Sequence, residues 1–229
     1  DYRLTDDGIR GCGLVVSTAV LAHGSAAPTP AACNPSAPTA QQWPALLQAD
    51  ITQVRPDTVI LAAGRWEVSD RRATAGGRWQ NITDPADRDY VRAQLERAVA
   101  IGSSGGARVV LATAPCFSSG EQPDGDPWPE DSTPRLTAYN ALLSEVAAAH
   151  PEQVSVLALG ALVCPDGRFH SQLDGITVRA PDGVHYPFFD RDHPLAADPG
   201  TAAVASAFGA WLAERILPSV LARSRPATP

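Results

Sequence analysis

The run Thr58-Val59-Ile60-Leu61-Ala62-Ala63 is the clearest indication of the fold class. It is short, continuous and apolar, which is typical of a strand buried on both faces of a parallel sheet. Ala107–Ala112 and Val154–Leu159 have the same character. Helical patterns separate these runs, over Pro85–Ala100 and Pro134–Ala149. Strands that alternate with helices predict an α/β fold, namely a three-layer α/β/α, flavodoxin-like parallel sheet.

The flanking segments complete this expectation. A helix should run from Thr39 to about Val54, and a last helix should begin at Thr201. Tyr2–Asp6 is a short candidate strand. Ser25–Thr39 should be irregular, because Ala, Pro, Ser and Thr dominate it. We expect Leu221–Pro229 to be a disordered tail.

Length and composition exclude several classes of protein. The chain of 229 residues is long enough for one large domain, which we place at 1–220, or at most two small ones. A net charge of −7 and no basic stripe argue against a nucleic-acid partner. No apolar run is long enough to cross a membrane. The sequence has no lysine, which excludes Schiff-base chemistry and a Walker-type phosphate loop.

The four cysteines indicate whether the protein resides in an oxidising or a reducing compartment. None of the four lies in a C-x-x-C pair, which argues against a zinc ribbon or a thioredoxin-type site. An even number of widely spaced cysteines fits two disulfides in an oxidising compartment. Of the three possible connectivities we favour Cys12–Cys33, closing the Pro/Ala-rich loop, and Cys116–Cys164, joining two loops that each follow a strand. Four reduced, buried thiols are the alternative.

The stretch Asp182-Gly183-Val184-His185 is the candidate catalytic motif. An Asp oxygen can accept from one ring nitrogen of the histidine three residues later, leaving the other nitrogen as a base. A solvated loop whose histidine caps a nearby helix is the other interpretation. Open α/β sheets bind ligands at the carboxyl ends of their strands. The loops that follow the predicted strands and reach that edge begin at Gly8, Gly64, Pro115 and Gly160.

Two further groups are candidates for binding. Arg65 and Glu67 follow a predicted strand directly, so each is a candidate substrate contact or a rim charge in a surface ion pair. A second group is dense in metal-ligand types, but its spacing matches no helical H-x-x-x-H arrangement, so we expect no metal and no cofactor. Its members are Asp182, His185, Asp190, Asp192 and His193.

Five motifs, taken in order and spacing, resemble the SGNH (GDSL-type) hydrolase superfamily. More specifically, the chain resembles the SGNH domain fused to the C-terminus of bacterial acyltransferase-3 membrane proteins, particularly actinobacterial ones. The resemblance covers nearly the whole chain. The motifs are Gly8-Ile9-Arg10-Gly11-Cys12-Gly13-Leu14, Leu61-Ala62-Ala63-Gly64-Arg65-Trp66-Glu67, Gly106-Ala107-Arg108-Val109-Val110-Leu111, Cys164-Pro165-Asp166-Gly167 and Asp182-Gly183-Val184-His185.

The resemblance implies a role for each matching residue. His185 corresponds to the general base and Asp182 to the residue that orients it. Gly11 matches the glycine whose N–H helps to form the oxyanion hole. The family's Gly-x-Asn-Asp block falls on Gly64–Glu67, where Trp66 replaces the asparagine that donates to the oxyanion. An indole N–H is also a donor.

The family's first block, a strand followed by Gly-Asp-Ser with serine as nucleophile, does not occur in these residues. Asp1 stands where the family's second strand would begin, so the resemblance implies that the first strand is missing. That strand is central in the family, and its loss should expose apolar surface on its neighbours. Two explanations remain open: a longer polypeptide with Gly-Asp-Ser upstream, which we favour, or a family member that has lost catalysis.

The resemblance thereby implies an extracytoplasmic O-acyltransferase or esterase domain, with acetyl as the expected acyl group. The expected acceptor is a carbohydrate or cell-envelope glycan hydroxyl. The acyl donor would come through an upstream membrane acyltransferase domain of the same polypeptide, which would tether this domain to the membrane. The alternative is a catalytically silent module that binds a glycan. Five aromatic residues are candidate stacking faces for a sugar: Trp66, Trp79, Trp128, Phe169 and Tyr186.

Overall fold

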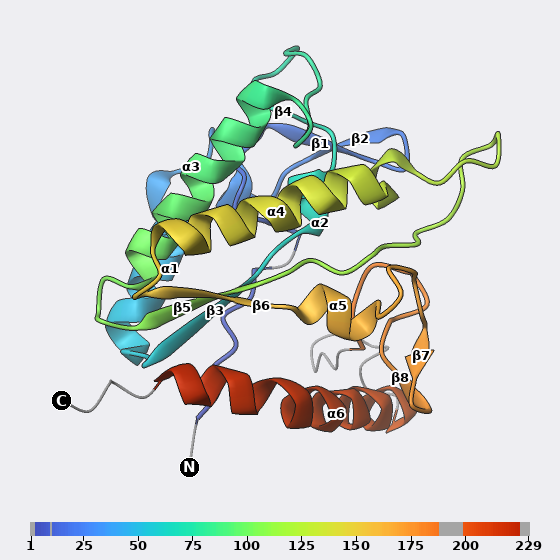
Figure 1. Cartoon of the computed structure of the whole chain (residues 1–229). Coiled ribbons are helices and arrows are strands. Elements are labelled where there is room, and N and C mark those ends of the chain that lie inside the picture. Colours follow the sequence, from blue (N-terminus) through green and yellow to red (C-terminus); the bar gives the residue numbers. More distant parts are fainter. Residues whose placement is uncertain (1–2, 10, 188–198, 225–229) are drawn as a thin grey trace.

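A parallel sheet lies at the centre of the molecule. The computed structural model describes residues 3–9, 11–187 and 199–224 (Figure 1). Three strands follow the order β3 (Thr58–Ala62), β5 (Arg108–Ala112) and β6 (Val154–Leu157), and both pairings are parallel. All three lie within the apolar runs named above. The prediction of a mixed α/β protein with a parallel sheet is therefore confirmed.

Helices cover both faces of this sheet. Helices α3 (Pro85–Gly102) and α4 (Thr133–Ala149) lie on one face, and α6 (Pro199–Ser224) lies on the other (Figure 1). Helix α1 (Trp43–Val54) packs against α3. The sheet contributes alternate side chains to the core shared with α3 and α4. Fully buried members of that core include Val91, Leu95, Val109, Leu111, Leu142 and Val146.

The predicted helices begin and end close to the expected residues. The backbone of Arg55 adopts a left-handed conformation with φ 50° just before Pro56, which ends α1 after Val54. The start differs, because Thr39–Gln41 forms a separate 3-10 turn, η2, before α1 begins at Trp43. Pro85 occupies the first turn of α3, where its missing N–H leaves no hydrogen bond unmade.

A second, antiparallel sheet was not predicted. It has the order β2-β1-β4, with β1 at Ala19–Ala22, β2 at Ser25–Pro28 and β4 at Arg71–Arg72. The expectation of an irregular segment is thus wrong for the four residues of β2. His23 and Gly24 both have positive φ, 49° and 69°, which is the geometry of a tight hairpin turn. This turn pairs β1 with β2 despite the weak strand composition of β2.

Short elements complete the chain. They are η1 (Ala31–Cys33), α2 (Arg65–Val68), η3 (Pro129–Asp131), α5 (Leu159–Val163), β7 (Gln172–Leu173) and β8 (Ile176–Thr177). Helices α2 and α5 begin within three residues of the ends of β3 and β6. The carboxyl edge of the sheet is therefore formed largely by short helical turns and long loops.

Two predictions at the ends of the chain are wrong within the described residues. Residues 3–6 form no strand, and Leu4 is 84% exposed, because no described strand lies beside this segment to pair with it. At the other end, α6 continues as far as Ser224 instead of giving way to an irregular tail at Leu221. Leu, Ala and Arg in this stretch are good helix formers. Residues 225–229 lie outside the described part.

Strand β3 is less buried than its apolar sequence predicts. Gly102 of α3 approaches Val59 and Val109, so these valines face α3, and by alternation Ile60 and Ala62 face the opposite side of the sheet. Ile60 is 40% exposed and Ala62 is also exposed. Within the described residues, no strand pairs with the outer edge of β3. Burial on both faces is therefore wrong for this strand.

Both favoured disulfides are present. Cys12 is bonded to Cys33 and Cys116 to Cys164, which leaves no free cysteine. Two disulfides indicate an oxidising, extracytoplasmic environment. In the part of the chain that the structure describes, no helix combines the length and apolarity needed to span a bilayer.

Candidate active site

Asp182 and His185 form the hydrogen bond that their spacing predicts. Oδ2 of Asp182 lies 2.7 Å from Nδ1 of His185. The other carboxylate oxygen, Oδ1, accepts the backbone N–H groups of Val184 (2.9 Å) and His185 (3.0 Å). Both side chains are more than a third exposed, at 50% for Asp182 and 63% for His185. The carboxylate thus fixes both the loop backbone and the imidazole.

These contacts alter the acidity of Asp182. Partial burial opposes its ionisation, but the hydrogen bonds from the His185 side chain and from the His185 and Val184 backbone outweigh burial and lower the pKa of the carboxyl. Asp182 is therefore a carboxylate over the neutral pH range. An ionised carboxylate at Nδ1 favours the imidazole tautomer that carries its proton on Nδ1.

Gly183 allows this loop to approach the rest of the protein. Its φ is +70°, and a Cβ built on it would lie 1.8 Å from the carbonyl oxygen of Ser118. The Ser118 N–H donates to the Gly183 carbonyl at 3.1 Å. The loop carrying the Asp–His pair is thereby fastened to the loop that follows β5.

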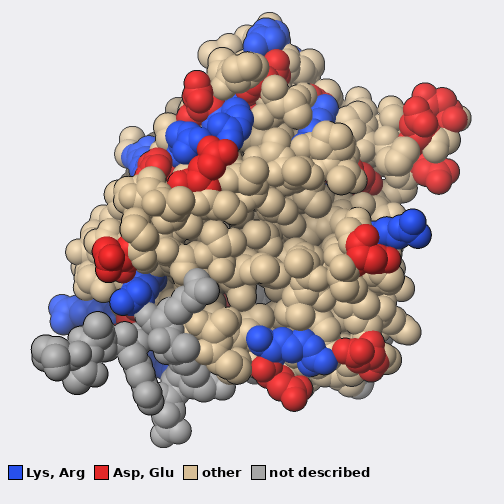
Figure 2. Space-filling model, viewed as in Figure 1, with Lys and Arg blue, Asp and Glu red and all other residues tan. Residues whose placement is uncertain are grey.

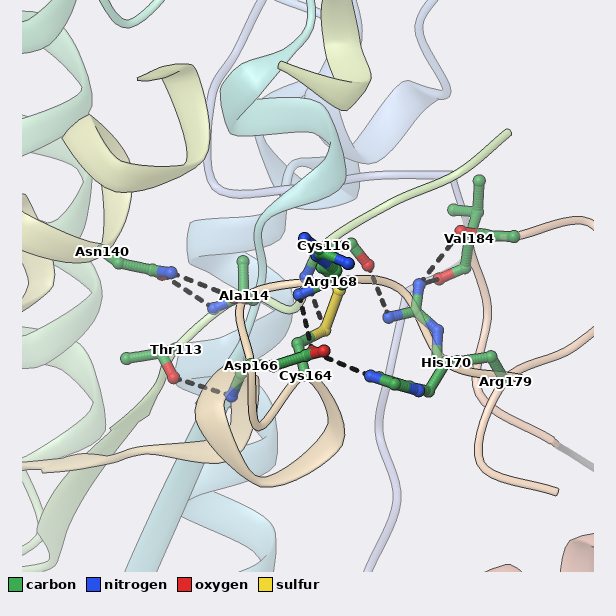
Figure 3. Close-up of a disulfide and its surroundings, with 12 residues drawn as sticks. Thr113, Ala114, Cys116, Asn140, Cys164, Asp166, Arg168, His170, Arg179 and Val184 are labelled. Carbon is green, nitrogen blue, oxygen red and sulfur yellow. Dashed lines mark hydrogen bonds and ion pairs between the residues drawn. A yellow bond between two sulfur atoms is a disulfide. The ribbon is translucent and has the colours of Figure 1, made fainter. Parts of the chain in front are cut away.

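Arg179 holds the same loop from inside (Figure 3). Its guanidinium donates to the carbonyls of Gly183 (3.1 Å), Val184 (2.7 Å) and Cys116 (2.8 Å). The residue is only 1% exposed. Burial lowers the pKa of the guanidinium, and the neighbouring negative charge of Asp182 opposes this effect. Arginine remains charged in such an environment, so three carbonyls share one buried cation.

The loop after β5 is itself anchored on two sides. Asn140 of α4 accepts the Ala114 N–H at 2.9 Å and donates to the Ala114 carbonyl at 3.0 Å. Thr113 accepts the N–H of Gly160 in α5 at 2.8 Å (Figure 3). The Cys116–Cys164 disulfide joins the same two regions. Arg179 therefore connects the Asp–His loop to a rigid part of the sheet edge.

Arg65 lies next to this assembly and forms an ion pair, but its side chain is only 13% exposed, so the pair is not at the surface. Its guanidinium donates to the Glu130 carbonyl (3.2 Å) and to Ser119 Oγ (2.9 Å) and forms an ion pair with Asp131. It also lies 5.1 Å from the centre of the Phe117 ring, and Arg179 lies 5.6 Å from that ring. Arg65 therefore contacts the same ring as Arg179, the residue that holds the Asp–His loop.

Glu67 is inside the protein. The residue is fully buried, and its Oε1 accepts the Leu14 N–H at 2.6 Å. Burial raises the pKa of this carboxyl, while the Leu14 N–H and the charge of Arg71 oppose the rise. Gly13 leaves room for the carboxylate, since a Cβ there would come within 2.0 Å of Oε1. In this structure Glu67 fastens residues 13–14 and offers no surface to a substrate.

The two expected oxyanion-hole residues are not joined to the Asp–His pair by hydrogen bonds within the described residues. Gly11 has a φ of +65° and lies against Pro30, and Trp66 is half-buried in α2. In the described ranges, no three His, Cys, Asp or Glu side chains lie close enough together to hold a metal ion. Three of its residues, Asp190, Asp192 and His193, lie outside those ranges.

Most of the expected stacking aromatics are in contact with other side chains of the chain. Trp79 lies 4.7 Å from the Arg72 guanidinium, and Trp128 lies 5.2 Å from the His23 ring. Phe169 and Tyr186 both contact Arg179. Burial raises the pKa of the Tyr186 hydroxyl well above its usual value, and the charge of Arg179 opposes this.

Sequence reasoning missed Arg179 and the pairing of His23 with Ser119. The nitrogen Nε2 of His23 lies 3.0 Å from Ser119 Oγ, although 96 residues separate the two in the chain. No local motif contains both residues, because the β1–β2 hairpin and the loop after β5 meet only in the folded protein. Arg179 precedes the Asp–His pair closely, but an isolated arginine in a loop carries no sequence signal for burial.

No protein-family model and no curated protein matches the chain. The geometry of the Asp182–His185 pair and the residues around it is therefore the basis on which a function is proposed.

Proposed function

We propose that this chain carries the His–Asp part of a serine-dependent acyl-transfer site. The reaction is O-acyl transfer or ester hydrolysis, with acetyl as the acyl group and a carbohydrate or cell-envelope hydroxyl as acceptor. His185 takes the proton from the attacking hydroxyl, and Asp182 orients the imidazole and stabilises its charged form. The nucleophile in this proposal is a serine of a Gly-Asp-Ser block outside these 229 residues.

One observation carries the proposal: Asp182 bonds Nδ1 of His185 at 2.7 Å while its second oxygen holds two backbone N–H groups. A solvated loop histidine needs no such arrangement. The loop is also fastened by the buried cation of Arg179, so the pair is held in one geometry before any substrate binds. Pre-organisation of this kind is what proton transfer at a fixed atom requires.

Three other observations agree with the finer parts of the proposal. The two disulfides fit an extracytoplasmic site of action. On the face shown in Figure 2, the described arginines lie in small groups beside Asp and Glu, with no extended basic patch for a nucleic acid. The exposed β3 suits an SGNH-type sheet in which a further strand lies beside it. Tethering to a membrane acyltransferase domain is part of the same proposal.

The experiment measures acetyl transfer by the polypeptide expressed from its natural reading frame. The donor probe is p-nitrophenyl acetate and the acceptor probe is chitotriose, with hydrolysis followed in parallel. His185→Gln and Asp182→Asn should each lower kcat/KM by about 10²–10⁴-fold, the range for loss of a general base or of its orienting group.

A second exposed Asp–His contact in the same protein serves as the control. Oδ1 of Asp166 bonds Nε2 of His170 at 2.8 Å, so His170→Gln and Asp166→Asn should leave the rate within twofold of wild type. If the His185 variant retains full activity, the proposal is wrong. If the natural polypeptide binds chitotriose but shows no transfer or hydrolysis, it is a silent binding module instead.

A further inference from the structure

Residues 11–17, which we call the strap, lie against helix α2. The Cys12–Cys33 disulfide fixes the start of the strap, and the Ser17 N–H donates to the Cys33 carbonyl at 2.8 Å at its end. Between these points Val15 is only 2% exposed and belongs to the main core. The strap forms no helix or strand, so its middle depends on side chains of other elements for its hydrogen bonds.

Two titratable side chains hold the middle of the strap. Oε1 of Glu67 accepts the Leu14 N–H at 2.6 Å. The Tyr90 hydroxyl accepts the Val16 N–H at 3.2 Å and donates to the Val16 carbonyl at 2.9 Å. Burial raises the pKa of this hydroxyl above its usual value, so Tyr90 stays protonated over the neutral range. Of the two, only Glu67 can change its charge there.

The second carboxyl oxygen of Glu67 is buried and has no hydrogen-bond partner among the described residues. A Cβ on Gly13 would lie 2.0 Å from Oε1 and 2.9 Å from Oε2, so the strap backbone lies directly against the carboxyl group. An ionised carboxyl in such a place is unfavourable, because one oxygen has lost its solvation without gaining a donor. Burial therefore raises the pKa of Glu67, although the Leu14 N–H, the charge of Arg71 and two nearby backbone N–H groups oppose the rise.

One cation serves two buried carboxyl groups. Arg71 of β4 donates to the Glu67 backbone carbonyl at 2.9 Å, but its ion pair is with Asp87 of α3, and both side chains of that pair are buried. Tyr139 of α4 faces Glu67 from the other side. Burial first and the charge of Glu67 second raise the pKa of its hydroxyl well above the usual range. In the described part of the chain, Glu67 thus shares its nearest cation with a carboxylate that binds it directly.

We propose that Glu67 is a pH-sensitive latch, which holds the strap to α2 when it is protonated and loosens the strap when it ionises. The protonated group still accepts the Leu14 N–H. On ionisation it gives its proton to solvent, and the carboxylate left behind gains solvation when the strap moves away. The stabilising effect of the protonated latch is complete below about pH 4.5, the usual pKa, and is lost as the pH rises through the raised pKa of the folded state.

The latch joins the two segments that hold the expected oxyanion-hole residues. The strap contains Gly11, and Trp66 precedes Glu67 in α2. A pH-dependent position of Gly11 relative to Trp66 is a consequence that rests on the function proposed above. The latch itself does not rest on that function, because it uses neither Asp182 nor His185. Its test measures structure and not activity, so the two proposals fail separately.

The test compares the 229-residue chain with its Glu67→Gln variant between about pH 4 and about pH 9. Glutamine keeps an acceptor for the Leu14 N–H and cannot ionise. The ratio of the unfolding constants in urea, wild type over variant, should rise by at least about tenfold over this range, which is the effect of a pKa raised by one pH unit. Relative to its intrinsic exchange rate, the Leu14 amide should lose protection with rising pH in wild type and not in the variant.

Glu130→Gln is the matched control. Oε1 of Glu130 accepts the His23 N–H at 2.9 Å and its side chain is 4% exposed, but Arg65 lies 3.4 Å from it. The wild-type pH dependence above about pH 4.5 should remain in this variant. Carbon-13 NMR of the Glu67 carboxyl needs no variant, and the signal should titrate with a midpoint above 4.5.

Two results would overturn the proposal. One is a Glu67 carboxyl signal that titrates at or below pH 4.5. The other is a Glu67→Gln variant that retains the wild-type pH dependence of stability and of Leu14 protection. Either result would leave Glu67 as a fixed hydrogen-bond acceptor for the strap, without a response to pH.

Discussion

Arg179 is the residue on which the geometry of the Asp182–His185 loop depends. Within the described residues it forms no salt bridge, and its charge is met by three backbone carbonyls and the faces of three aromatic rings, those of Phe117, Phe169 and Tyr186. A planar guanidinium can reach several acceptors at once, which an ammonium group cannot. The residue therefore acts by positioning the loop backbone.

We predict that Arg179→Met lowers the free energy of unfolding by about 2–4 kcal/mol, because it removes a buried donor from three carbonyls, of which the Gly183 carbonyl keeps the Ser118 N–H. Urea-induced unfolding of the 229-residue chain measures this. Arg168→Met is the matched control, since Arg168 is exposed, and it should change the free energy by no more than about 0.5 kcal/mol. Equal stability of the two variants would contradict the role given to Arg179.

At the scale of elements, the sequence predicts what is local. The three parallel strands are recognisable because each is a continuous apolar run, and the Asp182–His185 bond because the residues are three positions apart. Strand β2 was missed because its pairing depends on the His23–Gly24 turn and on β1, and not on its own composition. The burial of β3 was predicted wrongly because it depends on which segments cover the strand, and the apolar sequence of the strand does not specify them.

The two disulfides should differ in what they stabilise. By loop length, removal of Cys12–Cys33 (sequence separation 21) should cost about 3 kcal/mol, and removal of Cys116–Cys164 (sequence separation 48) about 4 kcal/mol. Only the second lies beside an acceptor of Arg179, the Cys116 carbonyl. Its loss should therefore also loosen the Asp–His loop.

Hydrogen exchange tests this difference. In the double variant Cys116→Ala, Cys164→Ala, the amides of Val184 and His185, which donate to Asp182, should exchange faster than in wild type. In the double variant Cys12→Ala, Cys33→Ala they should not change. Unchanged protection in the first variant would show that the Asp–His loop is independent of the disulfide.

In the whole molecule, β3 combines an exposed face with an edge along which no strand of residues 3–9, 11–187 and 199–224 pairs. The Asp57 carbonyl accepts the Arg108 N–H, so the backbone groups of odd-numbered residues in this segment face β5. The N–H and C=O groups of Ile60 therefore point to the opposite, outer edge of β3. Ile60 is 40% exposed and faces the same side of the sheet as α6. An apolar strand whose edge has no neighbouring strand among the described residues is a template for another strand.

We therefore predict that β3 is paired and covered in the polypeptide expressed from its natural reading frame. Ile60→Glu should cost less than about 1 kcal/mol in the 229-residue chain, where the side chain already meets water, but about 3 kcal/mol in the natural polypeptide, where the charge would be buried. Urea unfolding of both polypeptides gives the comparison. Val54→Glu, at a position that is 41% exposed on α1, should have the same small effect in both. An equally small effect of Ile60→Glu in both polypeptides would mean that β3 is a native edge strand, and that no further strand carries a nucleophile beside it.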